Sequence, residues 1–385
     1  MSHLVGRDPA TDRVLRVEID GGLISGITQI AAHAEHWIAP GLIDLQVNGY
    51  NGLDVNEPDL RPETVAGLVR ALARVGVTSV VPTLITAPAD QLLASLATIA
   101  QARNSASDIA HAIPYVHVEG PFLSDQDGPR GVHDARHIRP PDAAEVSGWQ
   151  RASRGLVGMV TISPHWPDSA AFIRAVTGLG IQVAIGHTHA TSEQVHQAVA
   201  AGATVSTHLG NGAHATLPRH PNYVWAQLAD DDLRVGLIAD GHHLPADTFK
   251  AMVRAVGLDR AHLVSDATAL AGMPPGRYRT PVGDAVDLSP DGRLSHVGTP
   301  YLAGAARGLN ECAAIATVLG DLRLDQVLVL AARNPGRLMP RGEPARGILA
   351  AGAVADLMTF DFESGQQALR AETVLARGAA VANGR

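Results

Sequence analysis

The sequence predicts an α/β fold: a (β/α)8 TIM barrel accompanied by a small β-sandwich domain built from both chain ends. Short apolar runs alternate with helical patterns from residue 40 to about residue 270. Each run is continuously apolar, which is typical of a strand buried on both faces of a parallel sheet. The two ends of the chain instead alternate apolar and polar residues, which is typical of strands with one solvated face.

The number and spacing of the apolar runs match the eight strands of such a barrel. The runs cover residues 43–47, 78–84, 113–119, 155–163, 182–187, 203–209, 233–240 and 261–267. The helical patterns between them include residues 62–76, 192–202 and 247–257. A doubly wound open sheet is the alternative, but no Gly-x-Gly-x-x-Gly phosphate turn follows a strand.

The change of pattern also predicts the domain organisation. Residues 1–39 would form the first part of the β-sandwich, residues 40–345 the barrel, and residues 346–385 the second part of the sandwich. Gly21-Gly22 lies between two alternating runs, which predicts a β-hairpin. The insertion 284–298 alternates in the same way and is therefore a candidate to join the sandwich.

Composition excludes several classes of partner. The net charge is −8 and there is no basic tract, so we expect neither nucleic acid nor an anionic membrane as a partner. No window is apolar for long enough to span a bilayer, and the N-terminus lacks a signal-like apolar run. The single cysteine, Cys312, permits no disulfide within the chain. We therefore expect a cytoplasmic protein.

Four of the predicted strands end in a group suited to catalysis. Glu119, His187, His208 and Asp266 each close an apolar run. In a parallel barrel the catalytic residues come from the C-terminal ends of the strands, so these four side chains should converge. Two histidines and a carboxylate, with a fourth position left to water, are a common catalytic zinc set. Asp266 would then be the general base, although alone it is equally compatible with a helix N-cap.

The first predicted strand has an unusual end. In many barrel metallohydrolases this strand ends in His-x-His and holds a metal ion, but here the corresponding residues are Gln46 and Asn48. Amide groups bind transition metals poorly compared with imidazole. The metal has therefore been lost or is held elsewhere.

Seven segments together resemble the N-acetylglucosamine-6-phosphate deacetylase family of the amidohydrolase superfamily. They are PGLIDLQVNG, VHVEGPFL, IGHTHA, STHLGN, IADGHH, LVSDAT and YLAGA, in this order, and the resemblance runs from about residue 38 to residue 305. The resemblance implies removal of the acetyl group from an N-acetylated amino sugar phosphate, with N-acetylglucosamine 6-phosphate as the first candidate. It also implies the barrel with a flanking sandwich.

The resemblance also implies where the metal is held. One divalent ion, Zn²⁺ by expectation, would bind to Glu119, His187 and His208, while Gln46 and Asn48 would lie around the site without binding the metal. The chain independently excludes a second kind of site. Some relatives bridge two metals with a carboxylated lysine at the end of the fourth strand, but the only lysine here is Lys250, in a predicted helix.

The family's substrate contacts can be carried over to this sequence by position. They fall on His133 for the sugar, and on Asn211, Gly212, Arg219, His243 and Leu302 for the remaining contacts, the phosphate included. The guanidinium group of arginine matches the oxygens of a phosphate. In the family this arginine reaches across from a neighbouring subunit, so the resemblance implies a homodimer.

The loop that carries several of these contacts departs from the family pattern. It reads GNGAHATLPRHPN, where the family has Asn-Ala-Met and Arg-Glu-Pro-Gly. N-acetylgalactosamine 6-phosphate and another N-acylated amine therefore stay open as substrates. Nucleobase deamination is disfavoured, because those relatives need His-x-His after the first strand. A non-catalytic scaffold is also disfavoured, because such proteins lose metal ligands that are all present here.

Overall fold

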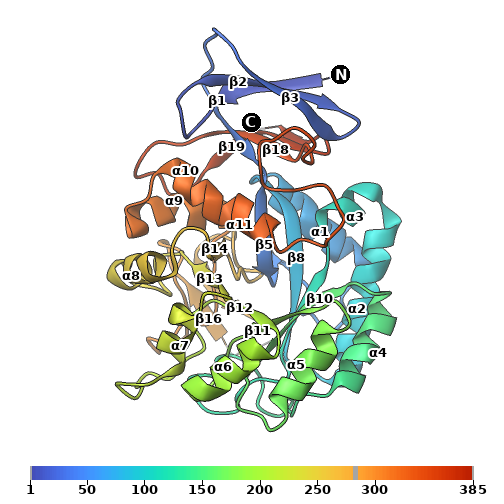
Figure 1. The fold of residues 1–385 in the computed structure, drawn as a ribbon, viewed down its shortest axis with the longest axis vertical. Coiled ribbons are helices and arrows are strands. Elements are labelled where there is room, and N and C mark those ends of the chain that lie inside the picture. Colours follow the sequence, from blue (N-terminus) through green and yellow to red (C-terminus); the bar gives the residue numbers. More distant parts are fainter. Residues whose placement is uncertain (1, 281–284, 384–385) are drawn as a thin grey trace.

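In the computed structural model, which describes residues 2–280 and 285–383, eight parallel strands form one sheet in the order β14-β13-β12-β11-β10-β9-β8-β5. The sheet curves into a barrel (Figure 1). The strands are β5 (Leu42–Val47), β8 (Val77–Ile85), β9 (Val116–Glu119), β10 (Val157–Ile162), β11 (Gln182–Ile185), β12 (Ala203–Ser206), β13 (Arg234–Ile238) and β14 (Ala261–Val264). All eight predicted strands are therefore confirmed.

Helices cover the outside of the barrel. They are α1 (Pro62–Ala73), α2 (Ala89–Ser105), α3 (Ser107–Ala112), α4 (Ala143–Ser153), α5 (Ser169–Thr177), α6 (Ser192–Ala200), α7 (Tyr223–Ala229), α8 (Ala246–Val256) and α9 (Leu309–Gly320), followed by α10 (Leu324–Leu328), the π-helical turn η1 (Val329–Arg333) and α11 (Asn334–Gly336). Helix α6 starts at a capping box formed by Thr191 and Gln194. Gly257 follows α8 with a φ of 78°, a conformation that glycine adopts without strain.

Two apolar layers hold the barrel together. Between strands and helices lies the larger cluster, which includes Leu68, Val118, Trp149 and Phe249. Inside the barrel, Ile43, Leu45, Tyr115, Met159 and Leu338 belong to a second, smaller cluster. The barrel is therefore a packed core, and its chemistry is confined to the strand ends.

The barrel closes between β5 and β14 through a buried carboxyl group. Asp44 Oδ1 accepts the backbone N–H of Ser265 at 3.1 Å, and the carbonyl oxygen of Gln46 accepts the N–H of Asp266 at 3.0 Å. Asp44 is fully buried, and burial raises its pKa to about 7, although hydrogen bonds from Ser265 and Gln46 act in the opposite direction.

A second sheet is built from both ends of the chain, as the sequence predicts. Its order is β20-β19-β18-β4-β1-β2-β3. The strands are β1 (Ser2–Arg7), β2 (Val14–Asp20), β3 (Leu23–Gln29), β4 (Trp37–Pro40), β18 (Leu357–Asp361), β19 (Arg370–Ala376) and β20 (Ala379–Asn383). Only one residue pair, Arg7 with Trp37, joins β1 to β4, and side chains from both halves share one core cluster. Figure 1 shows this sheet at the end of the barrel where β5 begins.

The Gly21-Gly22 hairpin is confirmed. Asp20 pairs with Leu23, and the two glycines between them have φ values of 57° and 82°. Positive φ at both central residues suits a tight hairpin between right-twisted strands.

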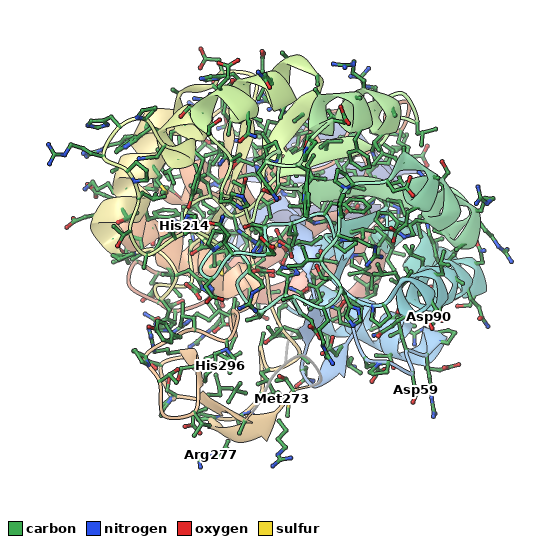
Figure 2. All side chains as sticks on the ribbon, turned by 90° about the horizontal axis from the view of Figure 1, so that it is seen from below. Asp59, Asp90, His214, Met273, Arg277 and His296 are labelled. Atoms are coloured by element: carbon green, nitrogen blue, oxygen red, sulfur yellow. The ribbon has the colours of Figure 1, made fainter. Side chains whose placement is uncertain are left out.

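The insertion does not join this sheet, so that part of the expectation is wrong. Its described residues, from Ala285 onward, form β16 (Ala285–Leu288) and β17 (Leu294–His296), which pair with β15 (Gly276–Arg279) in a separate three-stranded sheet. The reason is that Val286, Leu288 and Leu294 pack on a local apolar cluster with Leu270. In Figure 2, Arg277 and His296 mark this sheet where it projects from one edge of the barrel.

A buried polar cluster joins the terminal sheet to the barrel. Arg346 donates to Ser79 Oγ at 3.0 Å and to the carbonyl oxygen of His111 at 2.9 Å. His111 Nε2 lies 2.8 Å from Asp356 Oδ1. Within residues 2–280 and 285–383, no helix combines the length and the hydrophobicity needed to cross a membrane.

Asp44→Asn should change the pH dependence of stability. Because the pKa of Asp44 is raised from 3.8 to about 7 in the folded protein, the unfolded state loses this proton first as the pH rises. The wild type therefore loses stability between about pH 4 and pH 7 on account of this group, and the asparagine variant has no proton to lose.

The measurement is the free energy of unfolding in urea at pH 4.5 and pH 8, with a chelator present throughout. The variant minus wild-type difference should become more favourable to the variant by a few kcal/mol, of the order of 1.4 kcal/mol per pKa unit. A difference that is independent of pH would show that Asp44 titrates normally.

Candidate active site

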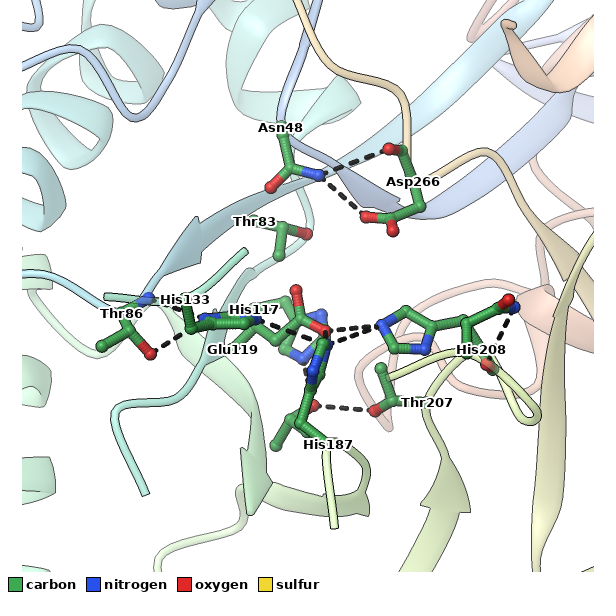
Figure 3. A network of polar contacts seen from close by, with 12 residues as sticks. Asn48, Thr83, Thr86, His117, Glu119, His133, His187, Thr207, His208 and Asp266 are labelled. Atoms are coloured by element: carbon green, nitrogen blue, oxygen red, sulfur yellow. Dashed lines mark hydrogen bonds and ion pairs between the residues drawn. The ribbon is translucent and has the colours of Figure 1, made fainter. Parts of the chain in front are cut away.

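Three of the predicted strand-end groups meet at the barrel mouth away from the terminal sheet. Glu119 is the last residue of β9, and His187 and His208 follow β11 and β12. Glu119 Oε1 lies 2.9 Å from His208 Nε2 and 3.2 Å from His187 Nε2, and the two histidine nitrogens are 3.1 Å apart. Figure 3 shows the three side chains converging from separate strands.

Strands β11, β12 and β14 end before the predicted strands do, because the backbone turns sharply just after each of them. His187, His208 and Asp266 have φ values of 46°, 25° and 49°, in the left-handed region that non-glycine residues rarely adopt. Backbone hydrogen bonds hold the turns: Ser124 donates to the His187 carbonyl at 2.9 Å, and Asn211 donates to the His208 carbonyl at 3.0 Å. Such local strain is typical of functional sites.

The arrangement fits a divalent transition metal ion. Ligand atoms around a tetrahedral zinc ion stand about 3.4 Å apart, given metal–ligand distances of about 2.1 Å. The three distances between Glu119, His187 and His208 are only slightly shorter. His187 also has the outer contact that a metal-bound imidazole needs, because its Nδ1 lies 2.7 Å from the carbonyl oxygen of Pro129.

The His187 ring lies against two glycines. A methyl group on Gly212 would come within 2.5 Å of His187 Nδ1, and one on Gly131 within 3.2 Å of its Cε1. Both glycines also have positive φ, 55° and 57°. The loops that carry them can therefore approach this ring only because the side chains are absent.

Glu119 and His208 form a charged pair in the metal-free protein. Burial opposes a charge on His208, but the hydrogen bond that its Nε2 donates to Glu119 outweighs burial and raises the pKa of the imidazole to about 9. The two histidines hold the pKa of the Glu119 carboxyl well below its usual range, although burial acts in the opposite direction. A metal ion must displace the proton of His208.

His133 lies next to this group and could replace His208 as the third ligand on distance alone. Its Nε2 is 3.3 Å from His187 Nε2. Its Nδ1, however, faces the backbone N–H of Thr86 at 3.4 Å and the Thr86 hydroxyl at 2.9 Å. Since a backbone N–H can only donate, the hydrogen of the ring belongs on Nε2. Burial and the neighbouring His187 lower the pKa of His133 to about 3, so this neutral ring presents a hydrogen-bond donor.

Asp266 stands on the β14 side of the group, held by Asn48. The Asn48 side-chain amide donates to Asp266 Oδ1 at 2.8 Å (Figure 3). Burial and the charge of Glu119 together raise the pKa of Asp266 to about 6, although His208 and His243 oppose the shift. A carboxyl group with such a pKa suits proton transfer near neutral pH.

The two amides at the His-x-His positions therefore have separate surroundings. Asn48 contacts Asp266, whereas the Gln46 side chain lies below the metal-ligand group, beside His117 and His208. Burial lowers the pKa of His117 to about 4, so its ring is neutral.

The structure places the expected substrate residues unevenly. His243 lies at the rim, where its Nδ1 is 2.7 Å from Asp240 Oδ2. Asn211 and Gly212 line a small cavity beside His187. Arg219 is exposed and has no polar contact among residues 2–280 and 285–383, and Leu302 pairs with Ser295 near the projecting sheet. No hydrogen bond or ion pair among the described residues links Arg219 or Leu302 to Glu119 or His187.

Several residues that shape the site were not predicted. Thr86 fixes the His133 ring, Pro129 accepts from His187, and Asp240 holds His243. Only Asp240 carried a signal in the sequence, since it closes an apolar run just as Asp266 does. The contacts of Thr86 and Pro129 depend on loops whose path the sequence pattern does not specify.

Comparisons with known proteins agree with this geometry. The model of the amidohydrolase family matches residues 37–383. N-acetylglucosamine-6-phosphate deacetylase of Danio rerio is 32% identical over 84% of this chain and 80% of its own length. N-acetylgalactosamine-6-phosphate deacetylase of Shewanella sp. is 30% identical over 90% of this chain and 87% of its own length.

Solved structures give the same result. N-acetylglucosamine-6-phosphate deacetylase of Mycobacterium smegmatis, in a complex of a variant with N-acetyl-D-glucosamine 6-phosphate, has a TM-score of 0.86 and 29% sequence identity. The match covers 99% of this chain and all of that one, 100%. The chain therefore belongs to the amidohydrolase family and, within it, to the N-acetylglucosamine-6-phosphate deacetylase family.

Proposed function

We propose that this protein is a metal-dependent deacetylase that hydrolyses the amide bond of an N-acetylated amino sugar phosphate, giving acetate and the free amine. N-acetylglucosamine 6-phosphate is the first candidate for the substrate. The observation that carries the proposal is the convergence of Glu119, His187 and His208 beside Asp266. A scaffold without catalytic function has no need for this costly set of buried charges.

Glu119, His187 and His208 would hold a single divalent ion, with Zn²⁺ as the expected metal. When bound, such an ion supplies Lewis-acid chemistry, because it polarises a carbonyl group and lowers the pKa of water. Imidazole and carboxylate ligands suit zinc. His133 is not counted as a ligand, because the hydrogen on its Nε2 faces the group.

The residues of the chain would then divide the proton transfers between them. Asp266, oriented by Asn48, takes a proton from the water that attacks the acetyl carbonyl carbon. His133 donates its Nε2–H to the carbonyl oxygen, where negative charge develops. As the C–N bond breaks, Asp266 returns the proton to the amine.

His243 and Arg219 would bind the 6-phosphate. The contact between Asp240 and His243 Nδ1 leaves His243 Nε2 directed away from that carboxylate and available to a ligand. Arg219 would reach the site of a neighbouring subunit in a homodimer, which is consistent with its exposure. Arginine suits a phosphate because its planar group donates two parallel hydrogen bonds.

The relatives leave two sugars as candidates. Deacetylases named for N-acetylglucosamine 6-phosphate and for N-acetylgalactosamine 6-phosphate are similarly related to this chain, at 32% and 30% identity. The loop 210–222 is expected to decide between them. Acetate release from a panel of N-acetylated hexosamines, each with and without the 6-phosphate, is the direct test.

The buried, single cysteine, Cys312, supports a cytoplasmic location.

Metal analysis tests the ligand set. Wild-type protein should bind one divalent ion per chain, and His208→Ala should lose both the ion and the activity, because two ligands make a weak site. The matched control is His165→Ala, which removes a half-buried histidine outside the group and should keep the ion.

The affinity for the ion should also depend on pH. Because the pKa of His208 is about 9 without metal, the proton competes with the ion at lower pH. The apparent affinity should fall about tenfold per pH unit between pH 8 and pH 6. Two tightly held ions per chain, or none after purification with excess metal, would contradict the proposed site.

Asp266→Asn should keep the metal and lose about 10² to 10⁴ in kcat, because an amide cannot accept the proton of water. Metal content and steady-state kinetics of the same preparation provide the measurement. Near wild-type turnover with metal bound would show that another group acts as the base.

Arg219→Ala should raise KM for the phosphorylated sugar far more than for its unphosphorylated analogue. Arg254→Ala, an exposed arginine on α8, is the matched control and should change neither value. The measurement is KM for both sugars with each variant. Equal wild-type KM values for the two sugars would reject phosphate recognition.

Mixing two variants tests whether Arg219 acts across a dimer. In a heterodimer of Arg219→Ala and Asp266→Asn, one site combines an intact Asp266 with the intact Arg219 of the other subunit. At a concentration of phosphorylated sugar far below the raised KM of Arg219→Ala, co-expression should therefore restore activity that neither variant shows alone. Mixed dimers as inactive as the separate variants would place Arg219 outside the neighbouring site.

A further inference from the structure

Beneath the metal-ligand group, the barrel contains a small cavity lined by both polar and apolar residues. Its volume is about 10 Å³, close to the space that one water molecule needs. The residues that line it include Gln46, His117, Thr207, His208, Gly236 and His262. We call it the floor cavity.

Three buried nitrogen atoms around the floor cavity have no hydrogen-bond partner within the described part of the chain. They are Gln46 Nε2, His117 Nδ1 and His208 Nδ1. Leaving a buried polar group without a partner costs about 1–3 kcal/mol, and such groups are rare in native proteins. Three of them around one cavity of this size indicate that they share a partner.

Two of the three nitrogens are donors. The amide nitrogen of Gln46 carries hydrogens in any state. His208 Nε2 faces Glu119 and His187, so when Nε2 uses its lone pair to hold a metal ion, the ring hydrogen must lie on Nδ1. The other histidine ligand, His187, donates its Nδ1–H to Pro129, whereas His208 Nδ1 has no hydrogen-bond partner among the described residues and its residue lines the floor cavity.

The third nitrogen is then required to be an acceptor. A water molecule that receives hydrogen bonds from Gln46 and His208 still has its own hydrogens to donate. His117 Nδ1 is the one unpartnered nitrogen of the three that can accept such a hydrogen. This requires the hydrogen of His117 to lie on Nε2, which is 2.7 Å from Thr161 Oγ1.

The hydroxyl groups behind His117 can accommodate this arrangement. Thr161 Oγ1 accepts from His117 Nε2 and lies 2.8 Å from Thr207 Oγ1, to which it can pass its own hydrogen. Every hydrogen bond in the chain from His208 to Thr207 then has one donor and one acceptor.

We propose that the floor cavity holds a structural water molecule through which His117 positions the metal ligand His208. His117 is thus a positioning residue for the metal site, although it contacts neither metal nor substrate. The inference rests on the proposed metal site, because it assumes that His208 Nε2 holds the ion. Removal of such an outer partner typically costs a factor of about 10 to 100 in metal affinity.

The test is the affinity for Zn²⁺, measured by competition with a chromophoric chelator in wild type and three variants. His117→Phe removes the acceptor and should weaken binding by about 10 to 100-fold. His117→Asn places an amide oxygen near the position of Nδ1 and should restore most of the affinity. Met159→Leu alters an apolar wall of the same cavity at nearly constant volume and should leave the affinity unchanged.

A second measurement does not depend on a folded variant. In ¹⁵N-histidine-labelled wild type with Zn²⁺ bound, the ring nitrogen shifts should identify His117 as protonated on Nε2 and His208 as protonated on Nδ1. His117 protonated on Nδ1, or a folded His117→Phe variant with wild-type affinity for Zn²⁺, would overturn the inference alone. A wild type that binds no Zn²⁺ would reject the proposed metal site and, with it, this inference.

Discussion

The closure of the barrel between β5 and β14 determines where the Asp266 carboxylate lies. Every other pair of neighbouring strands in the barrel is joined by a backbone ladder, but here the carboxyl group of Asp44 takes the place of part of that ladder. Just beyond β14, the backbone N–H of Asp266 donates to the carbonyl oxygen of Gln46, and the Asn48 side chain donates to the Asp266 carboxylate. The two amides that replace the His-x-His pair therefore do not mark a lost function. The Asn48 side chain holds the Asp266 carboxylate, and the backbone carbonyl of Gln46 accepts the N–H of Asp266.

The same mouth of the barrel concentrates strain and burial. Three residues of the site adopt left-handed backbone conformations, each of which costs on the order of 1–3 kcal/mol. The rigid strands below hold these turns in place, and the Gly131 and Gly212 loops press on His187 from outside. The site is therefore organised before a metal ion or substrate binds, and the bound ion has only to displace a proton from His208.

Predictions from the sequence succeeded for the strands, whose apolar pattern repeats along the chain. They failed for features that depend on the path of a loop. Apolar runs located all eight strands, and the rule that barrel chemistry lies at strand ends identified Glu119 and the two histidines as neighbours. Strands β11 and β12 were predicted too long, because an apolar run does not reveal the positive φ at which His187 and His208 leave the sheet. The insertion 284–298 was assigned to the wrong sheet, because alternating apolar and polar residues predict a strand but not the strand with which it pairs. Arg219 could be aligned with a family position, yet its side chain makes no contact that would reveal its role.

The terminal sheet has a consequence for how the protein is made. Strand β4 runs directly into the first barrel strand, but its neighbour β18 lies more than 300 residues further along the chain. At about 5–20 residues per second, a ribosome delivers β18 roughly 15 to 60 s after β4. During that interval one edge of β4 is unpaired and open to other chains. Strand β18 therefore covers the edge of β4 through which β4 could otherwise pair with other chains. A truncated product without β18 would retain this exposed edge.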